Sequence, residues 1–163
     1  THAQIDCSCE ISGYFWPNDP DEAEIRAAFA ANPYIDVWET DVNDWSEETE
    51  QRLEAQLDAA DVMLLPYKNL SSTVDTPLLV LEAMSKRCVV YMPERPRSLL
   101  QFLTLNPGCV PPEDDSPEAV ARWIGALAAD RPRLLAAQEG NATLHARRQA
   151  ETRAKLEAIL TGG

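Results

Sequence analysis

The sequence predicts an α/β fold, in which a doubly wound and mostly parallel sheet carries helices on both faces. Short runs of strand-forming residues alternate with longer amphipathic segments along the chain. Two of the runs, residues 61–66 and 88–92, are continuously apolar, which is typical of strands covered on both faces. The chain has 163 residues, of which 45% are hydrophobic. We therefore expect one globular α/β domain, residues 1–163.

The first third of the chain predicts two strand–helix units. Asp19 is expected to cap a helix with Pro20 in its first turn, and Asn32–Pro33 ends that helix. A second helix places Leu53 and Leu57, four residues apart, on its inner face. The expected elements are a strand over 5–16, a helix from 19 to 31, a strand over 35–39 and a helix over 46–60.

The rest of the chain predicts two buried strands and several helices. Thr76–Pro77 opens a helix that runs to about Lys86, and Ser116–Pro117–Glu118 caps a later one. Four apolar residues of that later helix share one face: Val120, Trp123, Ile124 and Leu127. Beyond the strands over 61–66 and 88–92, a short helix is expected from Ser98 and a short strand at 109–110.

A charged helical tail is expected over residues 131–163, with a break at Gly140. Its apolar stripe is thin, because Leu144 is followed only by Leu156, Ile159 and Leu160. Most helical stability in proteins comes from packing. We therefore expect residues from about Ala136 to Gly163 to be loosely held.

Charge and cysteine content exclude several classes of function. Acidic residues number 27 against 14 basic ones, so a net charge of −13 argues against nucleic acid and anionic membranes as partners. No apolar run is long enough to span a membrane, and no signal peptide opens the chain, so a cytoplasmic location is expected. The cysteines have no C-x-x-C spacing, and we expect buried, reduced thiols and no metal site. They are Cys7, Cys9, Cys88 and Cys109.

Ligands of doubly wound sheets bind beyond the carboxyl ends of the strands. The corresponding segments here are residues 13–18, 40–44, 67–76 and 93–98. This places a site without assigning its chemistry.

From Ala59 onward, four stretches resemble the donor-binding half of GT-B glycosyltransferases of group 1 (family 4). They are ADVMLLPY (60–67), VDTPLLVLEAM (74–84), VV (89–90) and GCVPPED (108–114), which leads into a helix. Their order and near-family spacing cover about the last two-thirds of the chain. The resemblance implies a Rossmann-like half of a GT-B enzyme, and therefore transfer of a sugar from a nucleotide donor to an acceptor held by another domain. It implies neither a metal nor another cofactor.

The resemblance also implies the donor-site residues. Glu82, the glutamate of the LEAM motif, would accept hydrogen bonds from the ribose hydroxyls. Its apolar neighbours in sequence lead us to expect that it is buried. The helix start at Thr76, Pro77 and Leu78 would face the diphosphate. Tyr67, Arg95 and Arg97 complete the expected donor-binding set, and Asp75 is the catalytic candidate.

Several positions depart from the family pattern. A second family glutamate corresponds to Val74, and the adjacent Asp75 either takes its role or caps the helix. The family's glycine after the LEAM helix is Arg87 here. The opening strand, with its basic GR…KG loop, has no counterpart, and neither does the acceptor domain. We therefore expect weak donor binding and no transfer by this chain alone.

Two other interpretations remain open. Nucleoside deoxyribosyltransferase-like domains share a start similar to residues 11–15 and a short helix with a glutamate. In that case Glu82 would be the nucleophile and Asp75 would contact the sugar, although the Gly-Thr and Glu-x-Gly pieces are missing. The other interpretation is a non-catalytic α/β domain that binds a partner.

Overall fold

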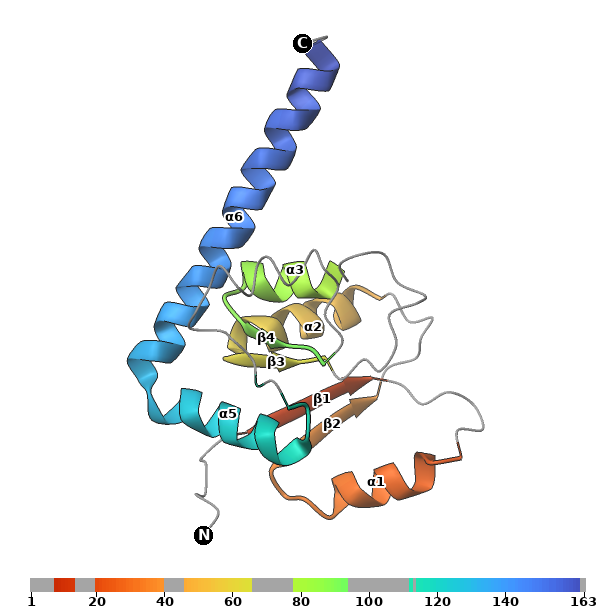
Figure 1. Cartoon of the computed structure of the whole chain (residues 1–163). Helices are drawn as coiled ribbons and strands as arrows, with labels where there is room; N and C mark the ends of the chain where they lie inside the picture. Colours follow the sequence, from red (N-terminus) through yellow and green to blue (C-terminus); the bar gives the residue numbers. More distant parts are fainter. Residues whose placement is uncertain are drawn as a thin grey trace. The chain divides into compact units, whose positions relative to one another are not determined.

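The computed structural model describes residues 8–13, 20–39, 46–65, 78–93, 112 and 114–161. The chain divides into two compact units, Thr1–Gln56 and Leu57–Gly163. Each unit contains one pair of parallel strands, so the α/β class is confirmed (Figure 1). The described residues form two two-stranded sheets rather than one doubly wound sheet.

In the first unit, strand β1 (Cys9–Gly13) pairs in parallel with β2 (Ile35–Glu39), whose bounds are those that the sequence predicts. Helix α1 (Glu22–Ala30) connects the two strands and ends before Asn32–Pro33, as expected. The prediction that Asp19 caps this helix is wrong. The helix begins after Asp21, whose helical backbone leaves its side chain without a capping hydrogen bond.

Helix α2 (Glu47–Ala59) follows β2, and the boundary between the units falls within it. Its inner face is as predicted, with Leu57 buried and Leu53 half-buried. The first turn is acidic, which suits the positive end of the helix dipole. Ser46 precedes the helix, and its hydroxyl accepts a hydrogen bond from the Thr49 N–H.

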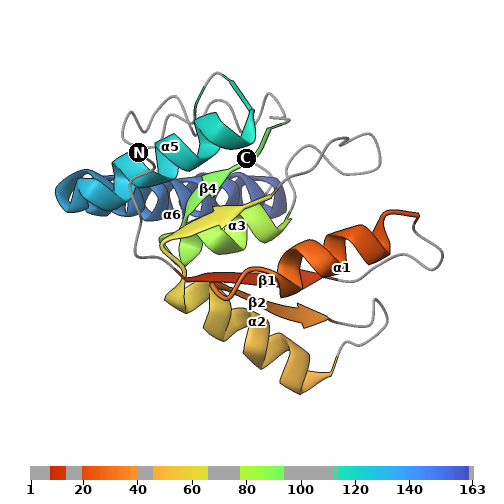
Figure 2. The same ribbon diagram turned by 90° about the horizontal axis from the view of Figure 1, so that it is seen from below.

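In the second unit, β3 (Val62–Leu64) pairs in parallel with β4 (Val89–Tyr91), and helix α3 (Leu78–Ser85) lies between them in sequence. Strand β4 is buried throughout, and α3 lies on one side of the pair and α5 on the other (Figure 2). Helices on both faces are therefore confirmed for this pair. Strand β3 is less covered than predicted, because Leu64 is 42% exposed.

Side chains from β4 alternate between two hydrophobic clusters, as the period of two in a strand requires. Val90 and Met92 enter a cluster that α3 shares, whereas Val89 and Tyr91 enter one that α5 and the start of α6 share. The first cluster consists of Leu57, Leu65, Val80, Ala83, Met84, Cys88, Val90 and Met92. The second consists of Val89, Tyr91, Trp123, Leu127, Leu134 and Ala137.

Helix α5 (Pro117–Ala129) begins as its sequence predicts. The Ser116 hydroxyl accepts a hydrogen bond from the Ala119 N–H, and Pro117 occupies the first helical position. Trp123 and Leu127 are buried on the predicted face. The Trp123 ring lies 5.9 Å from the Tyr91 ring, which joins α5 to the sheet.

Helix α6 (Arg131–Thr161) is continuous, so the predicted break at Gly140 is wrong. A glycine inside a helix costs only about 1 kcal/mol, and contacts on both sides of it offset this. Asn141 is buried, and its amide donates a 2.8 Å hydrogen bond to the Cys88 carbonyl. Arg131 and Gln138 both donate to Asp61, at 3.1 and 3.0 Å.

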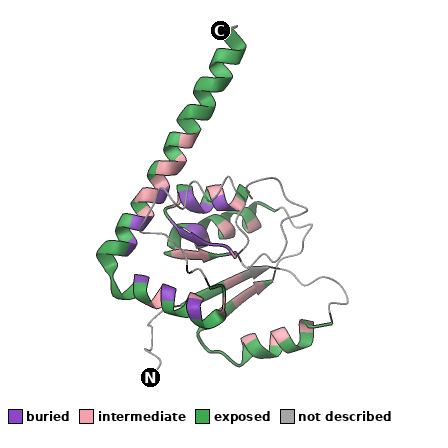
Figure 3. Cartoon of the chain, viewed as in Figure 1, coloured by how far each residue is buried: buried purple, intermediate pink, exposed green. Residues whose placement is uncertain are grey.

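The packed part of α6 extends further than the expected start of the loose segment at Ala136. Ala137 and Asn141 are buried, and Leu144 packs against the first hydrophobic cluster. Every residue from 149 to 161 is exposed (Figure 3). The helix therefore has an inner half that belongs to the second unit and an outer half that extends from it.

Helix α3 ends in a Schellman motif. The Cys88 N–H donates to the Ala83 carbonyl at 2.8 Å, and the Arg87 N–H donates to the Met84 carbonyl at 3.1 Å. This geometry needs a left-handed residue after the helix, and Arg87 supplies it with φ of 69°. Glycine adopts this conformation without the clash that a Cβ causes.

Replacing Arg87 with glycine is expected to raise the free energy of unfolding by about 1 kcal/mol, because it removes this clash. Arg87→Ala is the matched control. It removes the exposed guanidinium, 3.6 Å from Glu139, but keeps a Cβ, so its effect should stay within about 0.5 kcal/mol. Urea unfolding measures both variants, and a glycine variant no more stable than the alanine variant would contradict the prediction.

Replacing Asn141 with leucine is expected to lower the free energy of unfolding by about 2 kcal/mol, because the buried Cys88 carbonyl loses its side-chain donor. Thr143→Leu, at an exposed position of the same helix, should change it by less than about 0.5 kcal/mol. Urea unfolding of the two variants checks the difference. Equal effects would show that the Asn141 hydrogen bond does not stabilise α6.

Candidate functional site

The predicted donor site lies at the carboxyl ends of β3 and β4, which the parallel pairing brings to one edge. The chain leaves β3 at this edge, returns through α3 and re-enters the sheet at the amino end of β4. Leu78 and Glu82 are the two candidate residues that the structure describes. The remaining candidates lie outside the described residues: Tyr67, Asp75, Thr76, Pro77, Arg95 and Arg97.

Leu78 is the first residue of α3, and 68% of it is exposed. The first N–H groups of a helix have no partner inside the helix and carry its positive partial charge. The exposed start of α3 therefore has the polarity that an anionic ligand requires.

Glu82 lies one turn further along α3 and is exposed, so its expected burial is wrong. The buried residues of this helix are Val80, Ala83 and Met84, and residue 82 falls on the opposite side of the helix from them. The exposure of Glu82 could have been predicted from helical periodicity, but not from the apolarity of its nearest neighbours in sequence. The carboxylate is available to hydrogen-bond donors from solvent or a ligand.

The residues just before α5 make polar contacts with β4 and with one another. The Tyr91 hydroxyl donates to the Asp115 carboxylate at 2.9 Å. The Ser116 N–H and hydroxyl donate to Asp114, and they hold the pKa of that carboxyl below its usual range. These contacts fix the start of α5, where the family-like GCVPPED stretch ends.

The carboxyl end of β2 has a separate charge network. Arg26 of α1 donates to both carboxylate oxygens of Glu39 and to Glu22. The hydrogen bonds from Arg26 hold the pKa of Glu39 below its usual range. The Arg52 guanidinium lies 4.5 Å from the centre of the Trp38 ring. Because Arg26 is engaged with two carboxylates, it is not placed to neutralise a phosphate.

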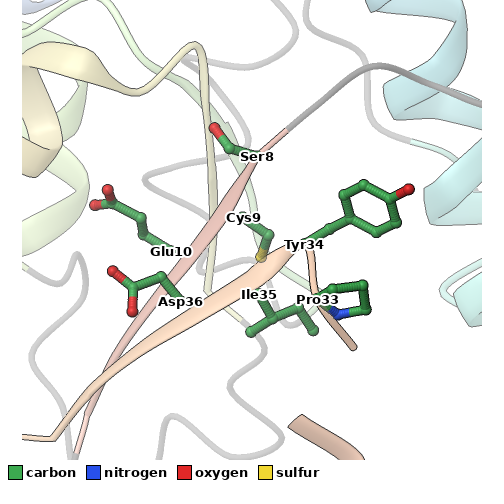
Figure 4. Close-up of a pocket in the computed structure, with 7 residues that line it drawn as sticks. All are labelled: Ser8, Cys9, Glu10, Pro33, Tyr34, Ile35 and Asp36. Carbon is green, nitrogen blue, oxygen red and sulfur yellow. The ribbon is translucent and has the colours of Figure 1, made fainter. Parts of the chain in front are cut away.

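A surface pocket lies at the opposite end of the first unit, at the amino ends of β1 and β2 (Figure 4). Sequence reasoning did not predict it. Glu10 and Asp36 lie opposite each other in the strand register and lie on the same side of the pocket. Two neighbouring carboxylates repel a diphosphate, so this pocket does not suit a nucleotide-sugar donor.

Two cysteines, Cys9 and Cys88, lie within the described residues, and neither forms a disulfide bond. Cys88 is buried as expected, whereas the exposed Cys9 contradicts the expectation of buried thiols. The Cys88 thiol lies 3.2 Å from the Leu57 carbonyl and 3.3 Å from the Ala60 carbonyl, to which it donates. Burial, with a smaller effect of Asp61 and Asp58, raises the pKa of this thiol to about 11. It therefore stays protonated at neutral pH and is unsuited to be a nucleophile.

Stability should depend on the ionisation of Cys88. The thiol has a usual pKa of 9.0 and a pKa of about 11 in the folded chain, so the folded chain retains a proton that the unfolded chain loses. The contribution of this thiol to stability is complete below about pH 9 and is lost as the pH rises towards about 11. Unfolding free energies of the parent chain and of Cys88→Ala should therefore converge over this range, and a constant difference would contradict the prediction.

Among the described residues, no group of three or more His, Cys, Asp or Glu side chains could hold a metal ion. No helix in the described part of the chain combines the length and the apolarity needed to cross a membrane. Comparison with known proteins gave no match to a family model, a curated protein or a solved structure.

Proposed function

We propose that the second unit, Leu57–Gly163, binds a nucleotide sugar and acts as the donor half of a glycosyltransferase. The observation that carries the proposal is the β3–α3–β4 unit, in which Glu82 faces solvent on α3 between two parallel strands. The acceptor would be held by another domain or subunit. A cytoplasmic location and a doubly wound, Rossmann-like arrangement of the strands belong to the same proposal.

The extent of the resemblance supports this proposal. The first family-like stretch begins at Ala60, three residues after the start of the second unit at Leu57. They continue through β3, α3 and β4 to the cap of α5 in the order in which these elements occur. If the second unit shares a domain with this family, the resemblance should be confined to that unit, as it is here.

The turn at Arg87 supports it as well. The resembled family has glycine at this position, and the chain here adopts the left-handed conformation that favours glycine. The chain therefore has the left-handed backbone that the family's glycine favours, although residue 87 is an arginine here.

Donor binding would combine two kinds of contact. The exposed Glu82 carboxylate can accept hydrogen bonds from both hydroxyls of a ribose, and each bond is charge-assisted. The exposed start of α3 favours the diphosphate. Asp75, Arg95 and Arg97 remain predicted contributors. The net charge of −13 opposes the anionic ligand, so binding should be weak.

Titration with a panel of nucleotide sugars, followed by backbone amide shifts, tests the proposal. We expect millimolar binding that perturbs amides of α3, and Glu82→Ala should weaken it at least tenfold, because even one charge-assisted hydrogen bond contributes about 1.5–3 kcal/mol. Glu50→Ala on α2 is the control, since it removes an exposed helical carboxylate elsewhere. If α3 amides stay unchanged at millimolar ligand while the fold is intact, the donor site is wrong.

An assay of base release from deoxynucleosides separates the two enzyme classes. A donor half alone should release no base, whereas a deoxyribosyltransferase needs no second domain for this step. If the parent chain releases base and Glu82→Ala does not, Glu82 is a nucleophile and the deoxyribosyltransferase interpretation is correct instead. Absence of both nucleotide-sugar binding and base release would favour a non-catalytic partner-binding domain.

A further inference from the structure

Two opposite charges lie one helical turn apart near the end of α3. Glu82 belongs to α3, and Lys86 follows the last residue of the helix, Ser85. The Lys86 N–H donates to the Glu82 carbonyl at 3.1 Å, so the helical geometry extends to residue 86 and places both side chains on one face. A glutamate four residues before a lysine is the order that favours an ion pair within a helix.

The described residues do not form this ion pair. The Lys86 ammonium instead contacts both carboxylate oxygens of Asp58, at 2.9 and 3.0 Å. Asp58 comes from α2, 28 residues earlier in the chain. Within the described part of the chain, the Glu82 carboxylate has no hydrogen bond or ion pair.

Asp58 is held beside α3 by contacts that do not involve Lys86. Its neighbour Leu57 is buried in the hydrophobic cluster that α3 shares. The Leu57 carbonyl also accepts a hydrogen bond from the Cys88 thiol, at 3.2 Å. Packing at the end of α2 therefore sets the position of Asp58, and the flexible Lys86 side chain extends to reach it.

The Asp58–Lys86 pair contributes little to stability. The Asp58 side chain is 56% exposed and the Lys86 side chain is 29% exposed, and ion pairs this open to solvent are weak. The pair has a second consequence. An ammonium group held by Asp58 is not available to Glu82, so the pair determines which of the two carboxylates is open.

We propose that Asp58 is a positioning residue of the donor site, because it holds Lys86 away from the Glu82 carboxylate. This rests on the function proposed above, in which Glu82 accepts hydrogen bonds from ribose hydroxyls. Two neighbouring hydroxyls need acceptor sites on the carboxylate at the same time. A lysine paired with Glu82 would compete for these sites and weaken binding of the nucleotide sugar.

The NMR signal of the Glu82 carboxyl carbon in the ligand-free chain shows where Lys86 lies. In Asp58→Asn we expect Lys86 to pair with Glu82 and to displace this signal at neutral pH. Asp58→Asn with Lys86→Met lacks the same carboxylate but also lacks the ammonium, so the signal should return to its position in the parent chain. Glu50→Gln is the control, since it removes an exposed carboxylate elsewhere on α2 and should leave the signal unchanged.

Binding of nucleotide sugars shows the effect on the site. In a panel that includes UDP-glucose, GDP-mannose and ADP-glucose, Asp58→Asn should bind the tightest ligand about twofold more weakly than Glu50→Gln, because an exposed ion pair at this spacing is weak. The two variants have the same net charge. The double variant keeps the net charge of the parent chain and should regain its affinity.

Lys86→Met alone separates this role from a structural one. If Asp58 served only to hold α2 against α3, removal of Lys86 would break the same contact and weaken binding as much as Asp58→Asn does. We expect Lys86→Met to bind no more weakly than Lys155→Met, which removes an exposed lysine from α6. Circular dichroism confirms that each variant folds.

Three results would overturn the proposal: a Glu82 carboxyl signal that does not move in Asp58→Asn, a displaced signal that persists when Lys86 is also removed, or a double variant that binds as weakly as Asp58→Asn. Absence of nucleotide-sugar binding by the parent chain would instead reject the function proposed above. The carboxyl signal would then still show whether Asp58 holds Lys86 away from Glu82.

Discussion

Burial of β4 on both faces is the constraint on which the second unit depends. Val89, Val90 and Tyr91 are at most 5% exposed, and so are the flanking Cys88 and Met92. A strand this buried must have cover on both sides, and its backbone polar groups need partners. Strand β3 satisfies the backbone, α3 covers one face, and α5 with the start of α6 covers the other. The remaining elements of the unit are arranged around this requirement.

The course of α6 follows from polar contacts with the same strand pair. The buried Asn141 amide binds the Cys88 carbonyl next to β4, and Asp61 next to β3 accepts hydrogen bonds from Arg131 and Gln138. Apolar contacts alone permit a helix to slide, whereas hydrogen bonds to defined atoms fix its register. The inner half of α6 is therefore fixed in direction, and that direction carries the outer half away from the unit.

Electrostatics limit what the candidate donor site can bind. The positive end of α3 favours anions, and the exposed Glu82 carboxylate can accept hydrogen bonds, but neither neutralises a diphosphate. Of the arginines near the expected ligand segments, Arg26 is engaged with Glu39 and Glu22, while Arg95 and Arg97 lie outside the described residues. A glycosyltransferase built on this site would depend on the predicted basic loop after β4 or on another domain for the charge of the donor.

The sequence by itself determined the elements whose signals lie within a few residues. The strand Ile35–Glu39, the Ser116 cap and the apolar face of α5 all follow from local capping and periodicity. Of the candidate site, it determined the helix that carries Glu82 and the position of Leu78 at the start of that helix. The apolar run over 88–92 also predicted a strand covered on both faces.

Tertiary structure decided the features that depend on distant partners. Gly140 does not break α6, because Asn141 and its neighbours are held by residues far away in sequence. The exposure of Glu82 depends on which face of α3 packs against β4, and the division into two units depends on contacts across the whole chain. Local propensities differ by about 1 kcal/mol per residue or less, and burial of a single large side chain contributes about as much or more. Packing therefore decides wherever the two conflict.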